Sequence, residues 1–328
     1  MNNLTGRLEK EEAFYKKMEE KLKDMPPILS EYYVSMRANR KSYTTIGVYI
    51  GNVLHFARFV TKNNVGDDFY KNVTSSNVES YMISLETRVT KNGIKKTGDD
   101  IIQARWSSLN HFFSWLVKRE YVDKNPIITV ERPKNQTEHK VTYLTKVEIN
   151  KLYRAVSNNP VKILAHRDRM IISLALATAL RVSALVNINI EDIDFDNNII
   201  RVVEKRHKVR GIEIGEQTAI ALREWIEIRN EEYQDVESTA LFLSLKRGRL
   251  SDDAVGHMLS RYCEEAGIKR ITPHKLRSTA ACMLAKNSIP VKAIAKQLGH
   301  NNISTTMKYI DVFEDDMDKA RNILDNLT

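Results

Sequence analysis

The sequence predicts a mainly α-helical protein with two domains: an all-helical N-terminal domain and a C-terminal α+β domain with a small antiparallel sheet. Apolar residues recur at helical spacing through most of the chain. One stretch, residues 193–214, instead has β-branched runs on both sides of charged turns. A polar stretch without periodicity, residues 131–145, separates the two helical parts. The length of 328 residues suits about two domains.

The first half predicts a helical domain over residues 26–132. A Glu- and Lys-rich segment before it predicts a helical N-terminal extension, residues 1–25, which ends at a Pro-Pro pair. Within the domain, residues 42–63 begin with a Ser and a Thr that suit N-caps. Residues 99–122 have the strongest helical period of this half. We therefore expect about four helices here.

The second half begins after an expected linker, residues 133–143, and covers residues 144–328. Thr145 and Glu148 form the spacing of a capping box at the start of a helix. The apolar helical run that follows has a break near Thr178–Arg181, and residues 193–214 predict two or three short antiparallel strands. From Thr218 onward the pattern is helical again.

Composition limits the class of protein. The net charge of +9 and pI near 9.3 favour a polyanionic partner such as nucleic acid, although many basic proteins bind none. The two cysteines show no zinc-ligand spacing, which suggests structural thiols in a reducing cytoplasm. An apolar run of about 18 residues or more would be needed for a membrane helix. The sequence has no such run, so we expect no membrane span, and its charged N-terminus is unlike a secretory signal.

Six polar residues of the second half stand out by their order. Each alone has an ordinary explanation: a capping or packed side chain, a solvated basic turn, or an HxxR that arises by chance. Their combined order is more informative than any one of them. They are Arg181, Lys205, His274, Arg277, His300 and Tyr309.

This set resembles the tyrosine recombinase family, the phage integrase and Xer-like site-specific DNA recombinases. "ATALRVSALVNINIEDID" resembles the segment around the family's first catalytic Arg, and "VVEKRHKVRGIEI" its hairpin with the catalytic Lys. The stretch from "TPHKLRSTAA" to "LGHNNISTTMKYI" is similar to the family pattern of HxxR, LGH and Thr-x-x-Tyr. The helical half then resembles the family's core-binding domain, and the second half its catalytic domain.

The resemblance implies a mechanism that needs neither metal nor other cofactor. Tyr309 attacks a DNA phosphate and forms a covalent 3′-phosphotyrosine, while Arg181 and Arg277 stabilise the charge on the non-bridging oxygens. His274 accepts the proton of the nucleophile and His300 donates to the phosphate. Lys205 donates a proton to the leaving 5′-oxygen, which departs as a 5′-hydroxyl.

The chain departs from the family pattern at two places. Ala184 stands where the family often has Glu, and Glu204-Lys205-Arg206 replaces a Gly-Lys-Gly turn. Lys208 is therefore a second candidate for the catalytic lysine. Residues 1–25 do not resemble the separate arm-binding domain of some integrases.

The expected partner is double-stranded DNA with specific recombination sites. The family acts as a homotetramer on two such sites, and we expect a monomer in the absence of DNA. The tail, residues 311–328, is amphipathic and implies docking on a neighbouring protomer, with packing on its own domain as the alternative. Five basic residues are candidates for phosphate contacts, and ordinary solvated surface is the alternative for each: Arg37, Arg40, Lys41, Arg105 and Lys208.

Three other functions compete with integration or excision of a mobile element, which we slightly favour. Xer-like resolution of chromosome or plasmid dimers uses the same chemistry. A type IB topoisomerase shares the Tyr, Arg and Lys chemistry but pairs no sites. A non-catalytic DNA-binding protein would have no need of Tyr309.

Overall fold

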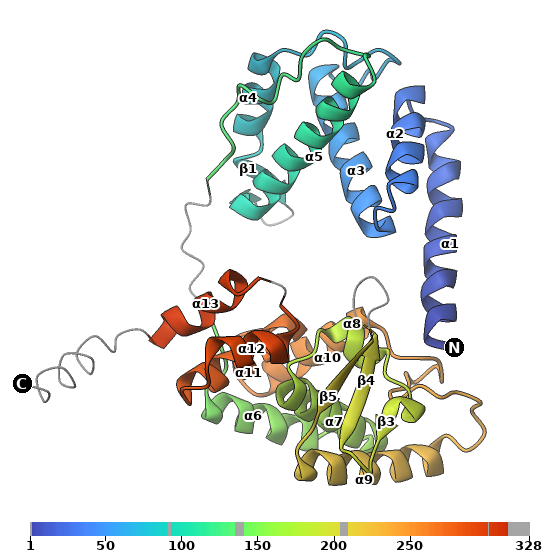
Figure 1. Cartoon of the computed structure of the whole chain (residues 1–328), viewed down its shortest axis with the longest axis vertical. Helices are drawn as coiled ribbons and strands as arrows, with labels where there is room; N and C mark the ends of the chain where they lie inside the picture. Colours follow the sequence, from blue (N-terminus) through green and yellow to red (C-terminus); the bar gives the residue numbers. More distant parts are fainter. Residues whose placement is uncertain (1, 91–92, 135–140, 204–208, 301, 314–328) are drawn as a thin grey trace, which may run out of the picture. The chain divides into compact units, whose positions relative to one another are not determined.

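The computed structural model describes two compact units, residues 3–139 and 140–328 (Figure 1). The boundary between the units falls inside the expected linker. No helix within the described part is long and apolar enough to cross a membrane. The described part excludes residues 1, 91–92, 135–140, 204–208, 301 and 314–328, and it gives only the backbone of residues 2–10, 88–90 and 313.

The first unit consists of five helices and one hairpin among its described residues. The helices are α1 (Asn2–Leu22), α2 (Pro27–Ala38), α3 (Tyr43–Val60), α4 (Ser75–Ser84) and α5 (Asp99–Lys118). Ser42 accepts a hydrogen bond from the Thr45 N–H and so caps α3, as predicted. Thr74 and Asn77 form a capping box at the start of α4.

Helices α3 and α5 have the predicted apolar faces, and these faces meet in the core of this unit. Phe56 and Phe113 pack there edge to face, with ring centroids 6.2 Å apart. Helix α1 belongs to the same unit: its Leu22 is buried, and its Glu19 accepts hydrogen bonds from Tyr33 and Arg37 of α2. Residues 1–25 thus contribute to the helical core.

The hairpin of strands β1 (Thr87–Thr90) and β2 (Gly93–Lys96) was not predicted from the sequence. The strands pair antiparallel from Thr87 with Lys96 to Thr90 with Gly93, and Gly93 has a φ of 99° that favours glycine. Every residue of β2 is exposed. No apolar alternation marks these strands in the sequence, so a periodicity search passes over them.

The second unit surrounds a small antiparallel sheet with helices (Figure 1). Strands β3 (Ile193–Asp194), β4 (Ile199–Val203) and β5 (Val209–Glu213) pair in the order β3-β4-β5, as predicted for residues 193–214. Short 3-10 turns lie at Ile190–Asp192 and Asp311–Phe313. The helices are α6 (Lys146–Ser157), α7 (Lys162–Thr178), α8 (Val182–Val186), α9 (Glu216–Glu232), α10 (Asp252–Glu265), α11 (Pro273–Lys286), α12 (Val291–Leu298) and α13 (Ser304–Ile310).

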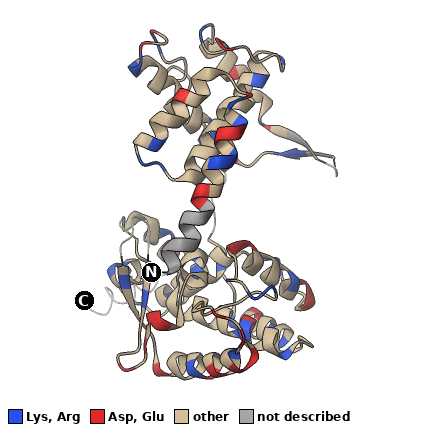
Figure 2. Cartoon of the chain, turned by 90° about the vertical axis from the view of Figure 1, so that its right-hand side faces the viewer, with Lys and Arg blue, Asp and Glu red and all other residues tan. Residues whose placement is uncertain are grey.

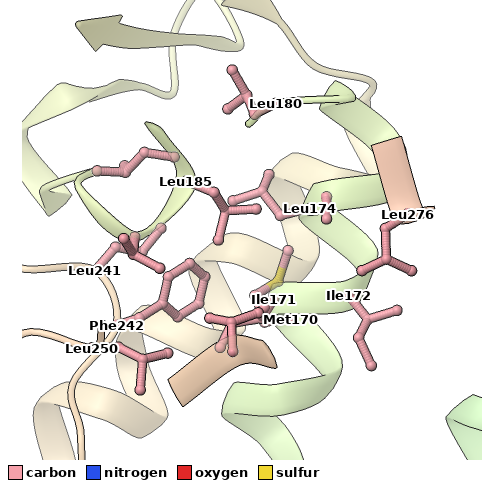
Figure 3. Packing of buried hydrophobic residues seen from close by; sticks show 14 of the residues in the cluster. Met170, Ile171, Ile172, Leu174, Leu180, Leu185, Leu241, Phe242, Leu250 and Leu276 are labelled. Carbon is pink, nitrogen blue, oxygen red and sulfur yellow. The ribbon is translucent and has the colours of Figure 1, made fainter. Parts of the chain in front are cut away.

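Helix α7 lies at the centre of this unit. Its buried Met170, Ile171 and Leu174 pack with Leu241 and Phe242 in one apolar cluster, seen from close by in Figure 3. The helix ends at Thr178, and Ala179 follows in a left-handed conformation with φ of 53°. The predicted break near Thr178–Arg181 is confirmed, and it places Arg181 at the N-cap of α8.

The start of the second unit is held by local and distant contacts. Thr145 and Glu148 form the predicted capping box at the start of α6. The backbone N–H of Leu144 donates to the Thr279 hydroxyl of α11 over 2.9 Å. This bond joins the first residues of the unit to the helix that carries His274 and Arg277.

Candidate active site

Arg277 is a buried cation at the junction of three helices. Pro273 starts α11, so His274 and Arg277 lie one turn apart on the same face. Only 2% of Arg277 is exposed. Its guanidinium donates to the Ala179 carbonyl over 2.7 Å and to the Leu298 carbonyl over 2.6 Å. These carbonyls lie at the ends of α7 and α12, where the helix dipoles favour a positive charge.

His300 lies directly after the end of α12 and contacts Arg277. Gly299 ends the helix with φ of 63°, as predicted, and the His300 N–H donates to the Ala295 carbonyl over 2.9 Å. The ring nitrogen Nε2 lies 3.0 Å from an Arg277 nitrogen, and Nδ1 lies 2.8 Å from the Thr306 hydroxyl. Since a guanidinium only donates, Nε2 accepts and the proton resides on Nδ1.

The surroundings of His300 keep its ring neutral. Burial, together with the positive charges of Arg277 and Arg181, lowers the pKa of His300 to about 4. Burial likewise lowers the pKa of His274, with contributions from Lys308 and Arg277. Both imidazoles are therefore acceptors near neutral pH, inside a cluster of cations.

Arg181 belongs to the same cluster. It is partly exposed at the N-cap of α8, just after the left-handed Ala179 whose carbonyl Arg277 binds. Its charge lowers the pKa of both His274 and His300, which indicates that all three side chains lie near one another. Two guanidiniums and two imidazoles from α8, α11 and the end of α12 thus converge at one place.

Tyr309 reaches this region from α13, but its hydroxyl lies in an apolar cluster. The side chain is fully buried among residues that include Ala179, Cys282 and Leu298. The hydroxyl has no hydrogen-bond partner within the described residues. Such a burial costs about 1–3 kcal/mol. This placement of the hydroxyl is therefore unfavourable, and it leaves the Tyr309 hydroxyl without a bond to either histidine among the described residues.

Helix α13 starts without a side-chain cap of its own first residue. Ile303 occupies the N-cap position, and the Ser304 N–H donates to the Asn302 side-chain oxygen over 2.9 Å. The Ser304 hydroxyl is one residue too late in the helix to serve as the N-cap. Asn302 therefore supplies the local bond.

The two candidate lysines lie outside the described residues, between β4 and β5. The strands on either side pair up to Val203 and Val209, so the predicted hairpin is present. Lys205 and Lys208 both remain predictions, as does the tail beyond Phe313.

Arg210 is a residue that the sequence analysis did not single out. The residue is partly buried on β5, and its guanidinium donates to the Lys296 carbonyl over 2.7 Å and to the Gln297 carbonyl over 3.1 Å. The alternation on β5 was a usable signal: Arg210, Ile212 and Ile214 share one face of the strand. A charged side chain on this face of β5 needs buried hydrogen-bond acceptors.

The candidate phosphate-binding residues of the first unit differ in their surroundings. Arg37 donates to Glu19 over 2.8 Å and stacks on the Tyr15 ring at 4.1 Å. Arg105 donates to the Tyr81 hydroxyl over 2.7 Å and is partly buried. Arg40 and Lys41 are exposed. None of these positions has been tested against DNA, and all remain predictions.

The described part of the chain contains no group of three or more His, Cys, Asp or Glu residues that could hold a metal ion. Cys263 and Cys282 are both buried and form no disulfide. Burial raises the pKa of both thiols, to about 11 for Cys282. Both cysteines therefore remain neutral thiols that pack in the interior.

Comparisons with known proteins show which family the chain resembles. Residues 142–315 match the model of the phage integrase family. The chain is 32% identical over 317 residues to the tyrosine recombinase XerC of Caldanaerobacter subterraneus subsp. tengcongensis. The alignment covers 90% of this chain and 86% of the relative.

Two solved structures share the fold. The XerH site-specific recombinase, bound to palindromic difH substrate in a post-cleavage complex, has a TM-score of 0.69 at 20% identity and covers 88% of this chain and 82% of its own. The Tn1549 transposon integrase in complex with transposon right end DNA has a TM-score of 0.68 at 20% identity. The match covers 89% of this chain and 98% of the integrase chain. At these identities the likeness shows the fold alone. With the family match over residues 142–315 and the XerC relative, the chain belongs to the phage integrase family of tyrosine recombinases.

Proposed function

We propose that this recombinase cleaves and rejoins DNA through a covalent 3′-phosphotyrosine formed by Tyr309. The observation that supports this most is the contact between Arg277 and His300 at 3.0 Å, inside a cluster that also receives the charge of Arg181. Such a cluster suits a phosphodiester in the transition state, when negative charge grows on the non-bridging oxygens. Cationic side chains then do the work that metal ions do in other nucleases.

The roles of the residues follow from their protonation. His274 is neutral near pH 7 and accepts the proton of the attacking hydroxyl. Arg181 and Arg277 each offer a planar set of donors to the phosphate. The anionic phosphate raises the pKa of His300 when it binds, and the protonated ring then donates to it.

Cleavage requires the Tyr309 hydroxyl to move. In the described structure the hydroxyl is buried and without a hydrogen-bond partner among the described residues, so leaving this position removes an unfavourable burial. We expect DNA binding to shift α13 and to bring the hydroxyl beside the phosphate. Lys205 then donates a proton to the leaving 5′-oxygen, which departs as a 5′-hydroxyl, with Lys208 as the second candidate.

A complete exchange needs two DNA sites. We propose a homotetramer that pairs two duplexes, acts in the cytoplasm, and passes through a four-way junction. Each retained phosphotyrosine conserves the energy of the broken phosphodiester, so a 5′-hydroxyl from another strand can attack it and reseal the DNA. No nucleotide cofactor is needed for this exchange.

The biological role that we propose is integration or excision of a mobile element. The likeness in fold to the Tn1549 transposon integrase agrees with it. Xer-like resolution of chromosome or plasmid dimers is the second candidate, and the 32% identity to a XerC over 90% of the chain favours it. Mapping covalent adducts in cells separates the roles: mobile elements give adducts at their ends, whereas dimer resolution gives one chromosomal or plasmid site.

A two-site plasmid assay tests the recombinase activity. A supercoiled plasmid with two copies of the mapped site should yield recombined products with purified protein. A type IB topoisomerase would instead relax supercoils on plasmids without any site and give no recombinants. A non-catalytic DNA-binding protein would retard the plasmid and change neither its linking number nor its sequence order.

A further inference from the structure

Arg210 lies on the covered face of the small sheet, where its neighbours are apolar. It pairs with Val202 across the strands, as Ile200 pairs with Ile212. Residues directly opposite in an antiparallel pair share one face, and Ile200, Val202 and Ile212 are all buried. A cation in this row needs buried acceptors, since its desolvation is otherwise costly.

The acceptors are the carbonyls at the end of α12. The last four carbonyls of a helix have no partner inside it. Here the Ala295 carbonyl accepts from the His300 N–H and the Lys296 carbonyl from the Gly299 N–H. Arg210 adds a second bond to the Lys296 carbonyl and binds that of Gln297. Arg277 binds the last carbonyl, that of Leu298.

Two guanidiniums thus hold one helix end from different elements, Arg210 from the sheet and Arg277 from α11. The negative end of the helix dipole stabilises both charges. His300 directly follows this end, and its ring contacts Arg277 at 3.0 Å. A further hydrogen bond, from the Gln297 side chain to the Thr178 carbonyl over 3.1 Å, joins the same turn to the end of α7.

We propose that Arg210 is a positioning residue of the recombinase site: it fixes the last turn of α12, and thereby the place of the His300 ring against Arg277. The proposal rests on the proposed function, since the geometry that Arg210 preserves is that of the phosphate-binding cluster. A displacement of about 1 Å in such a site costs about a hundredfold in rate. Arg210 therefore acts on catalysis through His300, without a bond to the reacting atoms.

The test uses the full chain with Arg210→Met, Arg210→Lys and the control Arg201→Met. Methionine keeps an apolar stem on the covered face and removes the donors, and lysine restores one donor group. Arg201 is on the neighbouring strand β4, where its side chain is 56% exposed and paired with Asp194 at 3.0 Å. Melting temperatures show which variants are folded.

Two measurements follow, and the first needs DNA. Arg210→Met should form the covalent adduct at least about tenfold more slowly at saturating DNA, with a dissociation constant within about twofold of wild type. Arg210→Lys should recover part of the rate, and Arg201→Met should match wild type. A loss confined to DNA affinity would make Arg210 a phosphate contact and would overturn the proposal.

The second measurement needs no DNA: an NMR titration of the His300 ring. In wild type the pKa is lowered to about 4. Release of the helix end should expose the ring to water and raise that pKa in Arg210→Met. The charged and titratable groups that face the ring are unchanged in this variant: Arg277 and His274 on α11, Arg181 before α8, and Lys308 on α13.

The two measurements separate the proposal from the function on which it rests. If wild type forms no adduct, the proposed function fails, and the titration still tests Arg210. If Arg210→Met and Arg201→Met are alike in adduct rate and in His300 titration, Arg210 has no positioning role.

Discussion

Among single residues, burial decides how the site is built. Arg277 is 2% exposed and finds carbonyl acceptors at two helix ends, so its charge is compensated in place. Tyr309 is fully buried, and its hydroxyl finds no such acceptor among the described residues. The Arg277 guanidinium is thus held in place by its acceptors, whereas the proposed role of Tyr309 requires its hydroxyl to move out of the apolar cluster.

The lowered pKa of His300 predicts a dependence of stability on pH. The folded-state pKa of about 4 lies below the ordinary value of 6.5, so the unfolded chain binds more protons between these values. The contribution of His300 to stability is therefore complete above about pH 6.5 and is lost as the pH falls towards 4. Denaturant unfolding of wild type and His300→Gln at several pH values measures this.

His300→Gln should lose less stability than wild type between pH 6.5 and 4, because it has no imidazole to protonate. His274 contributes in the same direction in both proteins, and it therefore cancels in the comparison. Equal losses in the two proteins would contradict the buried, neutral state of His300.

At the scale of elements, the hairpin β1–β2 is exposed and cationic. Lys95 and Lys96 are both exposed on β2, and in Figure 2 the hairpin projects from the helices of its unit with basic residues along it. An isolated two-stranded hairpin has little stability of its own in water. A β-ribbon of this size fits the major groove of DNA, and we expect it to contact phosphates there.

The double variant Lys95→Gln/Lys96→Gln should bind DNA more weakly, with a slope of log affinity against log salt reduced by about 2, since each phosphate contact contributes about 0.9. A matched control is Lys118→Gln/Lys124→Gln, two exposed lysines of the same unit. Fluorescence anisotropy at several salt concentrations measures both slopes. Equal slopes in the two double variants would remove the hairpin from the DNA interface.

Some elements of the fold can be predicted from the sequence, and others cannot. Long amphipathic helices such as α3 and α5, the sheet of residues 193–214 and the break before Arg181 follow from local periods and caps. The β1–β2 hairpin has no apolar period and was missed. Arg210 was missed because its partners, Lys296 and Gln297, are far along the chain and belong to another element. The buried position of the Tyr309 hydroxyl depends on how α11, α12 and α13 pack against one another.

For the whole molecule, the central expectation is assembly on DNA. The net charge of +9 favours encounter with DNA, and a homotetramer would bring two sites together. The tail after Phe313 lies outside the described residues, and its amphipathic sequence implies docking on a neighbouring protomer. Assembly and chemistry are therefore expected to be separable by truncation.

Removal of the residues after Asp315 should weaken tetramer formation on DNA and leave the folding of the monomer largely intact. Mass photometry of the complexes, beside the melting temperature of the free protein, measures the two effects. Normal tetramers from the truncated chain would contradict a docking role for the tail.

The central claim is that Tyr309 forms the covalent bond to DNA, and trapping on a suicide substrate tests it most directly. A nicked duplex from which the 5′-hydroxyl fragment diffuses away should leave wild-type protein attached to DNA, in a complex that survives denaturing gel electrophoresis. Tyr309→Phe should bind the same duplex with similar affinity and form no such complex. A covalent complex that persists in Tyr309→Phe would contradict the account.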